Sequence, residues 1–208
     1  MKRPDFLARQ ARQPSGLLGW LIGSIMAGET RAMNAAVLAA LDLEPTDSLL
    51  DVGFGPGVAV GLASQKLTRG FVGGVDFSEP MVKMARGRCS AAIAEGRVQL
   101  AHVDSSKLPF EDARFNKVLS VHTIYFWPDP LAQLQEIHRV LRGGGRLALG
   151  VRKNLLSAGT ASFPAGIFTF YDDDQIAAML QRSGFDDVGT VDAPVGDGRF
   201  SIVTATRV

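Results

Sequence analysis

Apolar residues in this chain occur in two patterns. In some segments they form short unbroken runs, typical of strands buried on both faces of a sheet; in others they recur every three or four positions, as on one face of a helix. The runs predict seven strands, at 49–52, 70–76, 98–103, 116–121, 146–151, 185–191 and 199–206. Helices are expected at 78–93, 129–141 and 172–183, after the first strand, and two or three times before residue 43.

Strands and helices alternate along most of the chain. This order predicts a parallel sheet with helices on both faces, joined by right-handed crossovers. Residues 194–198 alone separate the last two strands, and so short a connection cannot cross the sheet, so these two strands must be antiparallel. We therefore expect an α/β three-layer sandwich with a mostly parallel seven-stranded sheet, the last strand antiparallel, plus N-terminal helices.

The content of charged residues, cysteine and histidine limits the binding partners, disulfides and metal sites that can be expected. The chain has 22 basic and 21 acidic residues and no basic run, so no nucleic acid partner is expected. Cys89 is the only cysteine, which excludes an internal disulfide and is compatible with a reducing, cytoplasmic location. His102, His122 and His138 lie far apart, without the short spacing that builds a metal site on one helix, so we expect no metal.

The most informative stretch is SLLDVGFGPGVAV, residues 48–60. A buried strand leads directly into glycines at alternate positions, and then into a helix. Because glycine adopts positive φ and lets a ligand lie against the main chain, this turn predicts a nucleotide-like binding corner. The glycines are Gly53, Gly55 and Gly57.

Two cofactor classes compete for this corner. A dinucleotide fingerprint, G-x-G-x-x-G, needs a third glycine at position 58 or 60, where the chain has valine. Asp51 stands where a pyrophosphate would otherwise bind, and two like charges about 4 Å apart repel by about 4 kcal/mol at an effective dielectric near 20. The pattern therefore favours a ligand without phosphate.

The motif D-x-G-x-G-x-G resembles the first motif of class I S-adenosylmethionine-dependent methyltransferases of the small-molecule, type 11-like group. Their cofactor carries an ammonium and a sulfonium instead of a pyrophosphate. Four later segments are similar to this family in the same order, at residues 74–86, 103–110, 115–130 and 138–149. The resemblance implies a Rossmann-like fold, S-adenosylmethionine as the cofactor and methyl transfer as the activity.

Asp76 is the sharpest single prediction for the cofactor site. It closes the second strand, where its carboxylate can accept both hydroxyls of a ribose. The resemblance implies that Asp104 accepts the adenine amino group, that Ser105 offers its amide to a ring nitrogen, and that His122 faces the methionine part. The complete expected set is Asp51, Gly53, Phe54, Gly55, Gly57, Asp76, Phe77, Asp104, Ser105, Val121 and His122.

Methyl transfer requires a base only where the acceptor holds a proton at its working pH. His122 is the first candidate, because its ordinary pKa suits proton removal near neutral pH, and Tyr125 is the second. An equally open alternative is that His122 only orders the pocket or contacts the cofactor. Aromatic residues in variable segments favour a small hydrophobic or aromatic acceptor; those chosen are Trp20, Tyr125, Trp127 and Phe168.

We expect the whole chain, 1–208, to form one domain. Within it, 1–43 would be an N-terminal helical cover, 44–152 the cofactor-binding core, and 153–208 a lid segment followed by a helix and hairpin. The apolar stretch 16–28 has 13 residues, fewer than the roughly 20 of a spanning helix, so no stable membrane insertion is expected. The oligomeric state stays open, with a homodimer as one option.

Two other functions stay open at this point. A nicotinamide-dependent oxidoreductase would also use Asp76 for a ribose, although Asp51 and Val58 oppose a dinucleotide. A cofactor-binding protein without catalysis would need the same glycine corner. Cofactor specificity separates the first alternative from a methyltransferase, and turnover separates the second.

Overall fold

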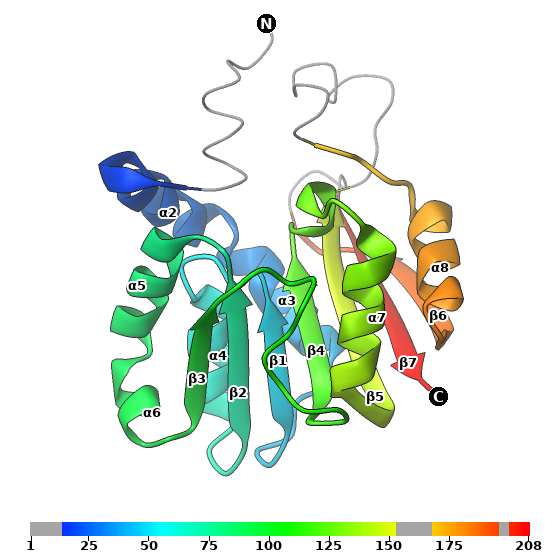
Figure 1. The fold of residues 1–208 in the computed structure, drawn as a ribbon, viewed down its shortest axis with the longest axis horizontal. Coiled ribbons are helices and arrows are strands. Elements are labelled where there is room, and N and C mark those ends of the chain that lie inside the picture. Colours follow the sequence, from blue (N-terminus) through cyan, green and yellow to red (C-terminus); the bar gives the residue numbers. More distant parts are fainter. Residues whose placement is uncertain (1–13, 153–167, 196–199) are drawn as a thin grey trace, which may run out of the picture.

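The computed structural model describes residues 14–152, 168–195 and 200–208. Seven strands form one sheet in the order β3-β2-β1-β4-β5-β7-β6, which can be followed in Figure 1. The strands are β1 (Ser48–Val52), β2 (Phe71–Asp76), β3 (Val98–His102), β4 (Phe115–Val121), β5 (Leu141–Arg152), β6 (Phe185–Asp192) and β7 (Phe200–Arg207).

The direction of the strands agrees with the sequence. Strand β1 pairs in parallel with β2 and β4, which brings the carboxyl ends of the central strands to one edge of the sheet. Strand β7 lies between β5 and β6 and is antiparallel to both. The mostly parallel seven-stranded sheet with a reversed last strand is thus confirmed.

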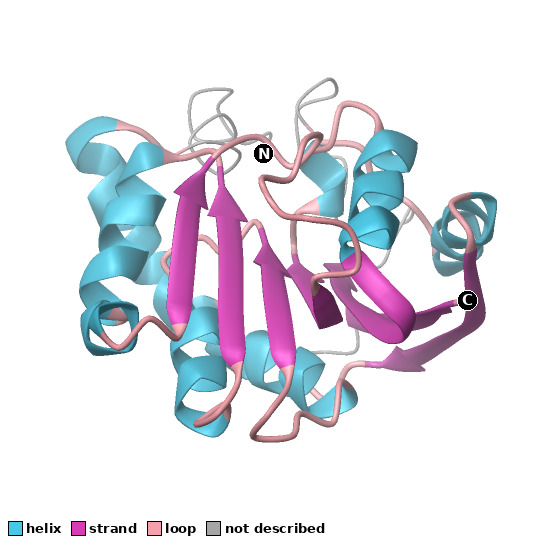
Figure 2. Ribbon diagram, turned by 60° about the horizontal axis from the view of Figure 1, so that its bottom comes forward, coloured by secondary structure: helices cyan, strands magenta, loops and turns pink. Residues whose placement is uncertain are grey.

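Helices cover both faces of the sheet, as Figure 2 shows. They are α2 (Gly16–Glu29), α3 (Arg31–Ala40), α4 (Val58–Lys66), α5 (Glu79–Arg88), α6 (Ser90–Ala94), a 3₁₀ turn at Ile124–Phe126, α7 (Pro130–Val140) and α8 (Asp173–Arg182). None of these helices, within the described ranges, combines the length and the apolar character needed to cross a membrane.

Successive residues of β1 pack into different hydrophobic clusters. Leu49 joins side chains of α3, α4 and α5 on one face, and Leu50 joins side chains of α7 and α8 on the other. Neighbouring side chains of a strand point to opposite faces, and both faces are covered, so all five residues of β1 are buried. This burial explains why the strand is largely apolar and does not alternate.

The helix expected over 78–93 is in fact two helices. Helix α5 ends at Arg88 and α6 begins at Ser90, with Cys89 between them at φ −106° and ψ 16°. Ala85, Cys89 and Ala92 nevertheless pack in the same hydrophobic cluster. Because the apolar periodicity continues through the break, the sequence pattern alone does not reveal it.

The fifth strand begins five residues earlier than expected. Leu141 already has extended backbone angles, φ −80° and ψ 142°, and pairs with Phe115, so α7 ends before the three glycines that follow it. Residues 143–145 lie inside β5, opposite a register shift between Phe115 and Lys117. The expectation of a strand starting at residue 146 was therefore wrong at its first boundary.

Asn116 ties β4 to the residues that lead into β1. The Ser48 N–H donates to Asn116 Oδ1 at 2.7 Å, and Asn116 Nδ2 donates to Asp47 Oδ1. Asp47 Oδ2 also accepts from the Glu44 N–H at 2.8 Å. These contacts fix the amino ends of the two central strands, at the sheet edge opposite their carboxyl ends.

Candidate functional site

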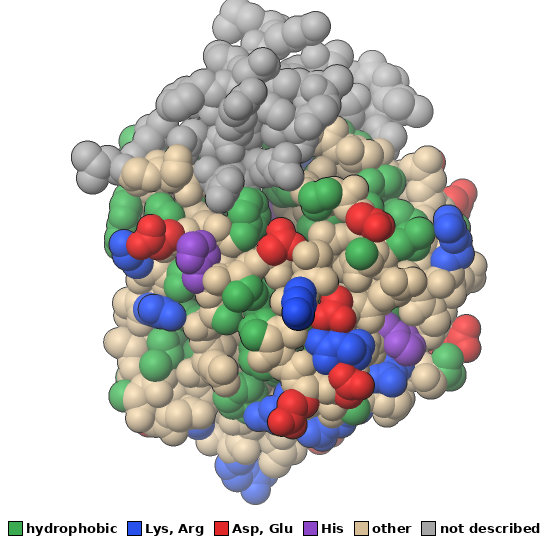
Figure 3. All heavy atoms as spheres, viewed as in Figure 1, with side chains coloured by type: hydrophobic (Ala, Val, Ile, Leu, Met, Phe, Trp, Pro, Cys, Tyr) green, Lys and Arg blue, Asp and Glu red, His purple; other side chains and the backbone are tan. Residues whose placement is uncertain are grey.

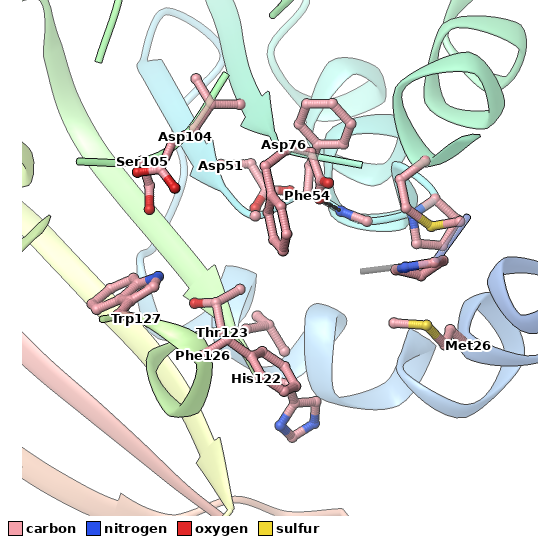
Figure 4. A pocket seen from close by; sticks show the side chains of 18 of the residues that line it. Met26, Asp51, Phe54, Asp76, Asp104, Ser105, His122, Thr123, Phe126 and Trp127 are labelled. Carbon is pink, nitrogen blue, oxygen red and sulfur yellow. Dashed lines mark hydrogen bonds between the residues drawn. The ribbon is translucent and has the colours of Figure 1, made fainter. Parts of the chain in front are cut away.

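A cavity opens at the carboxyl ends of β1, β2 and β4, the edge at which ligands bind in open parallel sheets. Its walls also include the segment after β3, helices α2 and α3, and the start of α7. Figure 4 shows Asp51, Phe54 and Asp76 on one side, with Thr123 and His122 on the other. Segments far apart in the sequence thus meet around one space.

Ten of the eleven residues expected at the cofactor site line this cavity. They are Asp51, Gly53, Phe54, Gly55, Asp76, Phe77, Asp104, Ser105, Val121 and His122. The remaining residue, Gly57, is the N-cap of α4 and lies against Ala85 of α5. Its contribution is to bring those two helices close together.

Two glycines of the turn after β1 are required by packing as well as by backbone angle. Gly53 and Gly57 both have φ +77°. A Cβ at Gly53 would collide with the side chain of Thr123, and a Cβ at Gly57 would lie 2.6 Å from the Cβ of Ala85. Gly55 has φ +54° and open space beside it. At Gly53 and Gly55 the turn therefore presents bare main chain to the cavity.

Asp76 is held at the end of β2 by main-chain donors. Its Oδ2 accepts from the Gly55 N–H and its Oδ1 from the Ser78 N–H, each at 2.8 Å. Burial raises the pKa of this carboxyl, and the two hydrogen bonds oppose the rise. Each carboxylate oxygen can accept more than one hydrogen bond, so Asp76 retains capacity for a ligand hydroxyl.

Asp51 is a second buried carboxyl that lines the same cavity. Burial, together with the charge of nearby Asp76, raises the pKa of Asp51 to about 8. Without a compensating charge this group is therefore largely protonated at neutral pH, whereas a cation bound beside it would favour the carboxylate. Two buried carboxyls in one cavity suit a ligand that carries positive charge.

Asp104 and Ser105 follow β3 and lie near the opening of the cavity. Asp104 is exposed, and its Oδ1 accepts from the Ser106 N–H at 2.8 Å. In Figure 4 both residues lie on the same side as Trp127, whereas Met26 lies on the opposite side. Different elements therefore form these two sides of the cavity.

His122 follows β4 in a left-handed conformation, φ +59°, and its N–H donates to the Gly150 carbonyl at 2.8 Å. Its Nδ1 lies 3.3 Å from the Tyr125 hydroxyl. Burial, with a smaller contribution from the positive charge of Arg152, lowers the pKa of His122 to about 4. The imidazole is consequently neutral near pH 7, and the same burial makes it a weaker proton acceptor than an exposed histidine.

Tyr125 lies behind His122 and is buried, and among the described residues it does not line the cavity. Its hydroxyl oxygen accepts a hydrogen bond from the Arg152 main-chain N–H. Burial raises the pKa of this phenol, so it stays protonated across the physiological range. Tyr125 thus reaches the cavity through two neighbours that line it, His122 and Phe126.

The residues expected to contact an acceptor do not all line the cavity. Trp127 is buried and lines the cavity. Phe168 packs on Phe126, which lines the cavity, with ring centroids 4.8 Å apart. Trp20 is 45% exposed and lines a separate surface groove together with His102.

Both the sequence and the fold of this chain are similar to those of known proteins. A family model described as a methyltransferase domain matches residues 50–149. The chain is 28% identical to YdaC of Bacillus subtilis (strain 168), which is named an uncharacterized methyltransferase, over 81% of this chain and 87% of that protein. A SAM-dependent methyltransferase from Aquifex aeolicus has the same fold, with a TM-score of 0.71, 21% identity and full coverage of both chains. This chain belongs to the class I S-adenosylmethionine-dependent methyltransferases.

The expected enzyme class and cofactor, S-adenosylmethionine, are thereby confirmed for this methyltransferase. A nicotinamide-dependent oxidoreductase and a non-catalytic binding protein are not favoured. The 27-O-demethylrifamycin SV methyltransferase of Amycolatopsis mediterranei (strain S699) is 33% identical over 58% of this chain. The match spans 44% of that relative, so it carries no acceptor identity over to this chain.

The cavity of the methyltransferase also contains residues that the sequence did not single out: Met26, Thr30, Asn34, Thr123, Phe126 and Gln133. Asn34 is 8% exposed and shares a helix face with buried Met33 and Val37. A polar residue on an otherwise apolar face was a usable signal for Asn34. The same signal was present for Gln133, which shares the buried face of α7 with Leu134, Ile137 and Val140. The described residues contain no cluster of His, Cys, Asp and Glu that could hold a metal ion.

Proposed function

We propose that this methyltransferase acts on a small, hydrophobic or aromatic acceptor. The observation that carries the proposal is that Met26, Phe126 and Trp127 line the same cavity as Asp76 and the glycine turn. Cofactor and acceptor would therefore share one largely apolar chamber with a few polar groups, as is usual for small-molecule sites. The name of the rifamycin relative supports an acceptor of this class.

The surface also supports a small acceptor over a polynucleotide. Figure 3 shows Lys and Arg side chains intermixed with Asp and Glu side chains on the face viewed. The complete sequence is nearly balanced, with 22 basic and 21 acidic residues. Nucleic acid binding usually depends on a continuous basic surface that neutralises phosphates, and the viewed face has none.

The residues present fit S-adenosylmethionine. Asp76 would accept the ribose hydroxyls, Asp104 the adenine amino group, and Ser105 would donate its amide to a ring nitrogen. Gly55 would let the cofactor approach the main chain, because the space beside its Cα is open, whereas Gly53 makes room for the Thr123 side chain. When bound, the cofactor supplies a methyl group attached to a positively charged sulfur, which is already a good leaving group.

The remaining cofactor contacts follow from charge and position. Asp51 would stabilise positive charge on the methionine part, because it is buried and lines the same cavity. Phe77 would pack near the adenine, and Val121 and His122 would border the methionine part, since all three line the cavity. These side chains mainly align the reacting groups and exclude water, which lowers the barrier without further covalent chemistry.

His122 would remove the proton from an acceptor that carries one. Its imidazole is neutral near pH 7 and lies at the end of β4 in the cavity wall. Tyr125, whose hydroxyl lies 3.3 Å from His122 Nδ1, would hold the imidazole ring in position.

The helices before residue 43 would cover the site, since Met26, Thr30 and Asn34 line it. The expected lid begins in 153–167, which lie outside the described residues.

The direct test is methyl transfer from labelled S-adenosylmethionine to a panel of phenols, amines, lipid-like acceptors, peptides and RNA. Turnover confined to the small acceptors is expected. Asp76→Ala should weaken cofactor binding by about 1.5–3 kcal/mol, the range for charge-assisted hydrogen bonds. Asp186→Ala, at an exposed position on β6, is the matched control and should leave binding unchanged. Turnover with peptide or RNA alone would refute the proposed acceptor class.

A further inference from the structure

Gln133 is a buried polar side chain in the wall of the cofactor cavity. It lies on α7, is 2% exposed, and its Oε1 has no hydrogen-bond partner among the described residues. A buried polar group without a partner costs about 1–3 kcal/mol. Such a group is uncommon in native structures, and here it stands where a ligand can supply the missing partner.

Contacts of α7 locate Gln133 along the cavity. Glu136, one turn further along the same helix face, accepts a hydrogen bond from the Leu108 N–H at 2.9 Å. Arg139, a turn beyond, donates to the Phe110 carbonyl at 2.9 Å, so α7 and this segment advance in the same direction. The segment after β3 and helix α7 therefore run side by side, and Gln133 lies at the end where that segment begins.

The segment begins with Asp104 and Ser105, so Gln133 belongs to the same end of the cavity as these two residues. Trp127, which precedes α7, lies on that side in Figure 4, and Met26 lies on the other. Trp127 and Gln133 both line the cavity. Under the proposed function, Asp104 and Ser105 bind one edge of the adenine, so the partner of Gln133 is sought on the same base.

The chemistry of a carboxamide matches a second edge of adenine. A glutamine side chain presents an acceptor and a donor next to each other, and the N6 amino group and N7 of adenine present the complementary pair. A carboxylate at Asp104 can use only one of the two hydrogens on N6. The other hydrogen lies on the N7 side of the base.

We propose that Gln133 recognises the N6 and N7 edge of the cofactor's adenine, in addition to the contacts from Asp104 and Ser105. This inference rests on the proposed cofactor contacts and goes beyond them by assigning base recognition to α7. Gln133 would act in binding specificity and not in methyl transfer itself.

The test measures binding of S-adenosylhomocysteine and its 7-deaza analogue by calorimetry. Wild type should bind the analogue about tenfold more weakly, which corresponds to one hydrogen bond of about 1.4 kcal/mol. Gln133→Ala should bind S-adenosylhomocysteine about tenfold more weakly and should no longer distinguish the two ligands. Gln135→Ala, at an exposed position of the same helix, is the control and should behave as wild type.

A second measurement separates binding from structure. Gln133→Leu removes an unpaired buried amide, so without ligand its thermal midpoint should equal or exceed that of wild type. A clearly lower midpoint would indicate a structural role and overturn the inference. Equal discrimination against the 7-deaza analogue by Gln133→Ala and wild type would also overturn it. If wild type binds neither ligand, the proposed cofactor contacts fail as well.

Discussion

Asp51 couples cofactor binding to pH. Its pKa is about 8 without ligand, and a cation bound beside it favours the carboxylate, so binding must release a proton at neutral pH. We expect the affinity for S-adenosylmethionine to fall by up to about tenfold for each pH unit below 8. Titration calorimetry between pH 6 and 9, in two buffers of different ionisation enthalpy, measures both the affinity and the protons released.

Asp51→Asn is the control for this titration, because it keeps the shape and the cofactor's own ionisation but cannot release a proton. The same pH slope in wild type and variant would show that Asp51 is not involved.

The raised pKa of Asp51 also makes the stability of the ligand-free fold depend on pH. The folded state holds the proton more tightly than the unfolded chain, whose carboxyl has the ordinary value of 3.8, so ligand-free stability should fall as pH rises from about 4 to about 8.

His122 predicts an unusual pH dependence of turnover. Because its pKa is lowered from 6.5 to about 4, a base at this position stays active well below the range of an ordinary histidine. For a phenolic acceptor, kcat should stay flat from pH 7 down to about 5. His122→Ala should lower kcat by no more than about 10²-fold at pH 7, the low end of the usual contribution of a general base, because a base whose pKa lies well below the working pH is weak.

Tyr125→Phe tests whether the tyrosine supports His122. This variant keeps the aromatic ring and removes the hydroxyl that lies 3.3 Å from His122 Nδ1. A smaller loss of kcat is expected, with unchanged cofactor affinity. An inflection near pH 6.5 in wild type, or full activity of His122→Ala, would contradict the role of His122 as the base. The second result would leave His122 as a residue that only orders the pocket.

Single residues differ in how far the sequence could predict them. Asp51 and Asp76 lie at the carboxyl ends of short buried strands, and the glycines follow β1 directly, so their placement at one sheet edge follows from strand direction alone. Gln133 could not be found in this way, because its exposure depends on how α7 rotates against the segment after β3. Tyr125 was expected in the cavity, but the hydrogen bond from Arg152 holds it behind His122.

At the scale of elements, Gly57 sets how closely α4 and α5 approach. Alanine at Gly57 would pay the cost of positive φ, about 1–2 kcal/mol, and would also collide with Ala85, which adds about 1–3 kcal/mol. Gly57→Ala should therefore lower the free energy of unfolding by about 2–5 kcal/mol in urea denaturation.

Comparing Gly57→Ala with Gly96→Ala separates the packing cost from the backbone cost. Gly96 has φ +73°, close to the value at Gly57, but nothing lies within 4 Å of a Cβ built there. Its substitution should cost only the backbone term of about 1–2 kcal/mol. Equal losses for the two variants would mean that the contact with Ala85 relaxes freely and that Gly57 is not needed for packing.

Element boundaries were predictable where a local signal exists. Helix α8 begins with a capping box in which Asp172 and Gln175 bond each other's main chain, and it starts within a residue of the expected position. The break at Cys89 and the early start of β5 at Leu141 were not predictable from periodicity. In both places tertiary packing, and the pairing of Leu141 with Phe115, decide where the element ends.

At the scale of the whole molecule, cofactor binding should stabilise the fold. A ligand that binds only the folded state at 100 times its dissociation constant contributes about 2.7 kcal/mol. For a chain of this size the thermal midpoint should rise by about 5–10 °C with S-adenosylhomocysteine and not with NAD or NADP. Scanning calorimetry checks this, and stabilisation by NAD alone would reverse the cofactor assignment.

The amide at position 116 also limits how this molecule can evolve. It accepts from Ser48 and donates to Asp47, and no carboxylate can do both. An aspartate there would set two negative charges side by side, unless the acid at 47 were exchanged in the same lineage. Aligned homologues should therefore show the two positions changing together, with acids at both being rare.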